Sequence, residues 1–188
     1  MIYYWFFGDK LRDGRPIPPD GEWLEHDGPL NLCEFGLHAS ANPFDALQYA
    51  PGPWLAMVEI DGAVVHGDDK LCAQRRKIVK RIDATELLRK FARQRALSVI
   101  HLWDAPAVVR EYLETGDESK RAAAWDAAWD AARAAWVAAG DAAGAAAWAA
   151  RAAAWAAGDA AGAARAAVWA AARQEFNRLV TEAFACTP

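Results

Sequence analysis

The sequence predicts an α+β fold, with a small mixed domain at residues 1–116 and a long Ala/Trp-rich helical tail at residues 117–188. Short β-branched and aromatic runs, separated by Gly- and Pro-rich turns, fill the first half of the chain and are typical of a small sheet. Alanine then supplies 32 of the 53 residues from Arg121 to Arg173, and alanine has the highest intrinsic helix propensity. A chain of 188 residues has room for one such domain and an appendage.

The first half predicts four or five strands and one short helix. Gly14–Gly28 is predicted as a loop, and Pro43–Ala50 as a helix capped by Ser40 or Asn42. The last predicted strand alternates charged and β-branched residues, which favours an edge or half-exposed strand. In chain order, the predicted strands are Ile2–Phe7, Gly36–Ser40, Trp54–Ile60, Ala63–His66 and Gln74–Ile82.

Two further helices are predicted to close the domain. Asp83 is placed to cap a helix over Ala84–Leu102, and Asp104 to cap a second helix over Ala105–Thr115. The dipeptide Gly116-Asp117 then combines a helix C-cap residue with an N-cap residue, so the tail begins there.

The tail keeps one helical phase for about fifty residues. The nonapeptide AAGDAAGAA occurs at 138–146 and again at 156–164, an offset of 18 residues or five helical turns. At about 100° per residue, one half of the helix carries the tryptophans and the other half carries only alanine apart from Val168. The tryptophans of the tail are Trp125, Trp129, Trp136, Trp148, Trp155 and Trp169.

This phase favours a contact helix that mediates self-association, giving a homo-oligomer, or that binds a host protein. An inert spacer is the alternative, because alanine-rich helices of sufficient length need no partner. A break at Gly140 or Gly158 would instead fold the tail into a hairpin or a three-helix bundle.

Charge is unevenly distributed along the chain. The net charge is −4, but residues 1–69 carry −9, residues 70–95 carry +8 and residues 96–188 carry −3. The basic stretch could meet the phosphates of a nucleic acid. The favoured alternative is that the basic stretch forms ion pairs with the acidic side chains of residues 1–69. The segment Gln74–Ile82 also has no aromatic residue that could stack on nucleic-acid bases. The candidate binding residues here are Arg75, Arg76, Lys77, Lys80 and Arg81.

His38 and Ser40 are the only candidates for chemistry that the pattern singles out. They lie two residues apart in a predicted strand and so share a face, which allows a nucleophile and a base. A structural histidine held by one hydrogen bond is the favoured interpretation. No phosphate loop, HExxH or GxSxG motif occurs, and Cys33, Cys72 and Cys186 lack metal-ligand spacing, so no cofactor and no metal are expected.

The sequence predicts a cytoplasmic protein that does not enter a membrane. Residues 1–10 have neither a basic region nor a long apolar core, whereas a secretory signal has both. Charged residues interrupt the alanine tract too often for a bilayer span.

Five runs of the sequence carry a resemblance to a known family: CEFGLHAS, NPFDALQYAPGPWLAMVEIDG, GDDK, VIHLWDAP and VVREYLETGDES. In these runs the chain resembles a family of phage and prophage proteins with a small α+β domain and a variable, repetitive tail. The resemblance covers roughly residues 1–120. It implies a phage-type accessory binding protein, with inhibition of a host defence protein as one such role.

A second, more distant similarity rests on the run GLHAS, the short helix after it and the VEIDG strand. This arrangement is similar to the strand–helix–strand core of ADP-ribosyltransferase-like domains. That similarity implies an enzyme acting on NAD or a related nucleotide, with His38 or Ser40 on the second-strand motif. The first strand, IYYWFF, offers no His or Arg to hold a nicotinamide nucleotide, which favours a non-catalytic relative.

Overall fold

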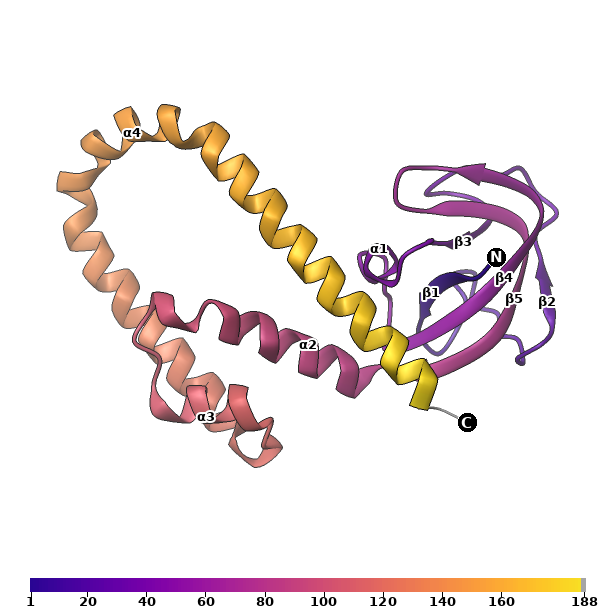
Figure 1. Ribbon diagram of the computed structural model, residues 1–188, viewed down its shortest axis with the longest axis horizontal. Helices are drawn as coiled ribbons and strands as arrows, with labels where there is room; N and C mark the ends of the chain where they lie inside the picture. The colour runs from indigo at the N-terminus through magenta and orange to yellow at the C-terminus, as the bar shows by residue number, and fades with distance from the viewer. Residues whose placement is uncertain (187–188) are drawn as a thin grey trace. The chain divides into compact units, whose positions relative to one another are not determined.

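A computed structural model describes the backbone of residues 1–186 and the side chains of residues 1–134 and 166–185. It confirms the predicted α+β class: an antiparallel sheet is followed by helices (Figure 1). The strands are β1 (Tyr3–Phe7), β2 (Trp23–Glu25), β3 (Leu37–Ala39), β4 (Trp54–His66) and β5 (Leu71–Asp83). The helices are α1 (Pro43–Leu47), α2 (Thr85–Ser98), α3 (Ala107–Thr115) and α4 (Arg121–Cys186), with the 3-10 turns η1 (Ile100–Leu102) and η2 (Glu118–Lys120).

The chain forms two compact units, and both ends of the sequence belong to the first. Unit 1 consists of Met1–Arg89 together with Arg173–Pro188, and unit 2 consists of Lys90–Ala172. Unit 1 therefore includes the last turns of α4, a grouping that the sequence pattern did not indicate.

In unit 1, the sheet is built on the long β4–β5 hairpin. Strand β5 pairs with β4 along one edge and with β2 and β3 along the other, so it is a central strand. The expectation of an edge strand at Gln74–Ile82 is therefore wrong, although the strand is half-exposed as expected. Its charged side chains are tolerated because ion pairs and aromatic rings cover them. The short strand β2 lies within the segment that was predicted as a loop.

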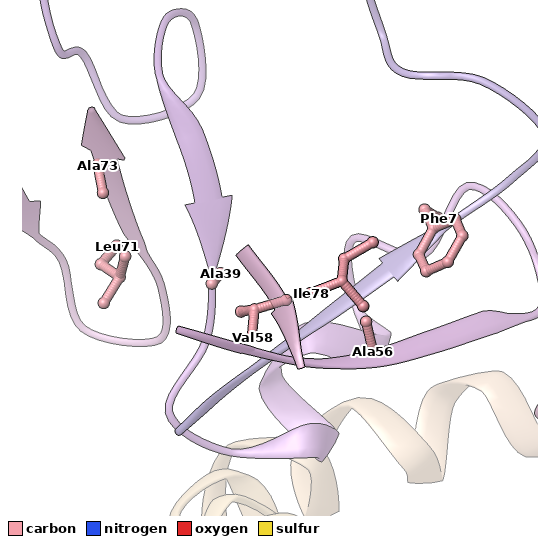
Figure 2. Close-up of a cluster of buried hydrophobic side chains, with 7 residues drawn as sticks. All are labelled: Phe7, Ala39, Ala56, Val58, Leu71, Ala73 and Ile78. Carbon is pink, nitrogen blue, oxygen red and sulfur yellow. The ribbon is translucent and has the colours of Figure 1, made fainter. Parts of the chain in front are cut away.

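The sheet closes on itself through one backbone bridge. Ser40, directly after β3, exchanges two backbone hydrogen bonds with Tyr4 of β1, at 2.8 and 2.9 Å. Strands β1, β4, β5 and β3 consequently form a ring. Figure 2 shows the buried cluster to which all four of these strands contribute. The cluster comprises Phe7, Ala39, Ala56, Val58, Leu71, Ala73 and Ile78.

The other side of β1 packs against residues 173–185 of α4, here called the C-terminal segment. Phe6 alternates with Phe7 along the strand and so points the opposite way. Its ring centroid lies 6.4 Å from that of Phe176, which in turn lies 5.9 Å from that of Phe44 in α1. The segment buries the side chains of Phe176, Leu179, Val180 and Phe184, whose spacing places them on one helical face.

Polar contacts fix the C-terminal segment in register on unit 1. Arg173 forms an ion pair with the buried Asp45: its NH1 donates to Oδ2 at 3.0 Å, and its NH2 lies 2.6 Å from Oδ1. The side-chain oxygen of Asn177 accepts a hydrogen bond from the Phe44 backbone at 3.2 Å, and Lys80 donates to the Phe184 carbonyl at 3.2 Å.

In unit 2, the capping residues predicted between α3 and the tail are present. Gly116 has the left-handed C-cap conformation, with φ at 70°, and the Asp117 side chain accepts from the Ser119 amide at 3.0 Å. A Cβ built on Gly116 would come within 2.6 Å of the Arg93 guanidinium carbon, so a larger residue would displace the end of that flexible side chain. Helix α3 begins at Ala107, without the side-chain cap that was expected from Asp104.

Helix α4 is a single helix of 66 residues. It continues through Gly140 and Gly158, where a break was the alternative expectation. The first turns of α4 have a buried face at Ala124 and an exposed face at Trp125 and Trp129.

Candidate functional site

The His38 ring is held by backbone groups, as the sequence analysis favoured. The ring Nε2 accepts a hydrogen bond from the Cys33 backbone amide at 3.1 Å. The backbone carbonyl of His38 accepts a hydrogen bond from the Arg76 side chain at 2.5 Å. Burial is the main cause that lowers the pKa of His38 below its usual value, and the charges of Lys70 and Arg76 lower it further. The imidazole is therefore neutral at neutral pH, with Nε2 already occupied.

Ser40 is only 2 % exposed, and its backbone forms the bridge that closes the sheet. The enzymatic alternative needs His38, Ser40 and an acidic group to converge on an open cleft. Two of the cavities on unit 1, of about 270 and 240 Å³, are lined by neither His38 nor Ser40.

The larger cavity lies at the β4–β5 turn, between the start of β1 and α1. Three carboxylates line it, from Asp45, Asp68 and Asp69, next to the ammonium group of Lys70. Asp45 is ion-paired to Arg173, and Asp69 accepts a hydrogen bond from Tyr49 at 2.6 Å. Sequence reasoning missed this cavity because its walls come from three segments that meet only after the sheet closes.

Three of the five candidate basic side chains on β5 pair with acidic residues from the first 69. These exposed pairs each contribute about 0–1 kcal/mol to stability, so their main effect is to neutralise opposite charges across the sheet. This arrangement is the internal ion pairing that the sequence analysis favoured. The pairs join Arg75 to Glu25 (3.1 Å) and Asp61 (2.5 Å), Lys77 to Glu59 (2.6 Å), and Arg81 to Asp20.

Arg76 is buried inside unit 1, at 5 % exposure. Its guanidinium carbon lies 3.4 Å from the centroid of the Trp5 ring, and its NH1 donates to the His38 carbonyl. Burial lowers its pKa to about 9, so the side chain stays charged at neutral pH. A guanidinium in this position links β3 to β1 and is not available to a phosphate.

Helix α4 carries the two most exposed aromatic side chains of the described part of the chain, together with a third exposed tryptophan. Trp125 is 72 % exposed, Trp129 is 63 % exposed and Trp169 is 53 % exposed. The other three candidate tryptophans, Trp136, Trp148 and Trp155, lie outside the residues whose side chains are described.

Within the described residues, no group of three His, Cys, Asp or Glu side chains is arranged to hold a metal ion. The same part of the chain contains no helix that is long and apolar enough to cross a bilayer.

Residues 1–90 match the family described as "Domain of unknown function (DUF7666)", which covers the sheet and the start of α2. No curated protein and no solved structure matches the chain. The phage family and the ADP-ribosyltransferase-like domains therefore stay predictions from the sequence.

Proposed function

We propose that the protein is a non-catalytic binding protein that associates with a second copy of itself through helix α4. The exposure of Trp125, Trp129 and Trp169 carries the proposal. Trp125 and Trp129 lie one helical turn apart, and exposed apolar side chains that share a surface mark interaction sites. Tryptophan is also enriched among the residues that dominate binding energy. An inert spacer gains nothing from exposing such side chains to water.

The phase of α4 supports the same conclusion. At about 100° per residue, Phe176 and Val180 lie about 60° and 100° around the helix axis from Trp125. These two buried residues make the contact face of the C-terminal segment. In helical phase, the exposed tryptophans therefore fall in the same half as the residues by which the C-terminal segment packs against protein.

Two side chains on which the enzyme alternative depends are engaged by the fold, which favours a non-catalytic role. The His38 ring accepts a backbone hydrogen bond, and Ser40 is buried. A reducing, cytoplasmic location belongs to the proposal as well, since Cys33 and Cys72 are free thiols.

Light scattering on the full-length double variant Trp125→Ala/Trp129→Ala tests the proposal. Loss of a central interface tryptophan costs about 2 kcal/mol or more of binding free energy. The double variant should therefore dissociate at roughly 1,000-fold higher concentration than the wild type. Trp103→Ala is the matched control, because Trp103 is also exposed, at 41 %, but lies outside α4. Equal masses for the wild type and the double variant would contradict the proposal.

A further inference from the structure

The His38 ring holds the turn that precedes β3, residues 30–36, here called the Cys33 turn. His38 lies opposite Cys72 in the sheet, and its Nε2 accepts the hydrogen bond of the Cys33 backbone amide at 3.1 Å. An imidazole nitrogen can accept a hydrogen bond only while it carries no proton. This contact therefore requires a neutral His38.

The Cys33 turn depends on contacts from outside itself. Cys33 has a φ of 78°, a left-handed conformation that side chains other than glycine rarely adopt. Besides the His38 ring, two cationic side chains hold this residue. Arg12 donates to the Cys33 carbonyl at 3.2 Å, and the Cys33 side chain interacts with Lys70 and raises the pKa of its ammonium group. Loss of one of these contacts should favour local opening of the turn.

Positive charge surrounds the His38 ring. Burial is the largest cause that lowers the pKa of His38, and three cationic side chains lower it further. A hydrogen bond with the Gly36 backbone acts in the opposite direction. The three cationic side chains are Lys70, Arg76 and Arg12.

The carboxylates beside this corner already have partners. Glu34, the carboxylate of the turn itself, accepts a hydrogen bond from the Asn31 side chain at 2.5 Å. Asp69 accepts one from Tyr49 at 2.6 Å. The thiol of Cys72, opposite His38, is uncharged because burial raises its pKa. A proton on His38 would therefore add a fourth positive charge to this corner.

We propose that this corner is an acid-sensitive switch, in which protonation of His38 opens the Cys33 turn while the sheet stays folded. A proton on Nε2 converts the acceptor into a donor, which then faces the N–H group of Cys33. In the open turn the ring is hydrated, so it binds a proton at its ordinary pKa of about 6.5. The proton therefore stabilises the open turn relative to the closed one. This inference does not depend on self-association through α4.

Opening the turn changes the surface next to the cavity at the β4–β5 turn. It frees Arg12 and Lys70 from their contacts with Cys33. Lys70 also lines that cavity. Opening further separates Gly36 from Cys72, whose Sγ lies only 3.5 Å from the position of a Cβ built on that glycine. Acid should thus produce an exposed, cationic segment beside the cavity.

Hydrogen exchange at single amides of the full-length protein tests the switch. Nuclear magnetic resonance follows exchange from about pH 7.5 to about pH 5.5, with correction for the intrinsic pH dependence of exchange. Protection of the Cys33 amide should fall several-fold, up to about tenfold, because proton binding by the open turn shifts the equilibrium in this range. The control is the Ser40 amide, which donates to the Tyr4 carbonyl at 2.9 Å and should keep its protection. Constant protection at Cys33, or an equal loss at both amides, overturns the switch.

Two variants separate the proton on the ring from the packing of the ring. His38→Gln supplies an amide oxygen that accepts from the Cys33 amide and does not titrate, so protection should be independent of pH. His38→Ala supplies no acceptor, so protection should be low at every pH. A loss of protection in His38→Gln that follows pH as in the wild type overturns the switch. If His38→Gln does not fold, the wild-type comparison of Cys33 with Ser40 decides.

His26→Gln is the matched control for His38→Gln. The Nε2 of His26 lies 3.1 Å from the Pro29 carbonyl, which can only accept a hydrogen bond. A proton on the His26 ring therefore leaves that contact intact. Exchange at the Cys33 amide in His26→Gln should depend on pH as in the wild type, and loss of this dependence would assign the effect to the wrong histidine and overturn the switch.

Discussion

Truncating Phe176 to alanine should lower the unfolding temperature of the protein strongly, although only 12 residues of the sequence follow it. The side chain is fully buried, at 0 % exposure, and packs against the rings of Phe6 and Phe44. A buried Phe→Ala change costs about 3–5 kcal/mol, because the transfer energy is lost and a cavity remains. Domains are stable by only about 5–15 kcal/mol in total.

For a chain of this length, each kcal/mol lowers Tm by about 2–4 °C, so the expected drop is about 6–20 °C. Circular dichroism during thermal and urea unfolding measures it, at one fixed protein concentration because an oligomer's stability depends on concentration. Phe35→Ala is the control, since Phe35 is 53 % exposed and should change stability by about 0.5 kcal/mol or less. A loss below about 1 kcal/mol for Phe176→Ala would refute the packing of the C-terminal segment on unit 1.

Three further outcomes are expected. His38→Ala should cost about 1 kcal/mol by leaving the Cys33 amide without its acceptor. Burial lowers the pKa of His38 in the folded protein, so the unfolded chain binds a proton at this residue first as pH falls below about 6.5. The stability of the wild type should therefore fall in that pH range. In urea titrations, His38→Ala should make this fall smaller. Gly116→Ala should cost about 1 kcal/mol or more in urea titrations, because of the positive φ and because the new Cβ must displace Arg93. Gly116→Asn should cost less in the same titrations, because Asn adopts positive φ more readily. Duplex DNA should bind weakly to residues 75–95 in a fluorescence titration, and a salt-sensitive submicromolar complex would contradict the internal ion pairing.

Local signals predicted most elements of the fold. Gly116-Asp117 carries its own turn chemistry, so the start of the tail was predicted without tertiary information. The strand at Leu37–Ala39 and the helix from Pro43 lie close to their predicted bounds for the same reason. The backbone hydrogen bond to the His38 ring also followed from its neighbourhood in the chain.

Features that depend on distant segments could not be predicted in this way. The central position of β5 follows from pairing with β2 and β3, both more than thirty residues away, and its charges suggested an edge instead. The packing of Phe176 was missed because the alanine-rich tract before it dominates the pattern of the tail. The cavity at the β4–β5 turn needs the closed sheet, which depends on the single bridge between Tyr4 and Ser40.

Sedimentation equilibrium of the full-length wild type over a wide range of concentrations tests the central claim most directly. A binding helix that joins two copies predicts a mass of two chains, each of 20.5 kDa, which falls toward one chain on dilution. A mass of one chain at every concentration would contradict self-association through α4.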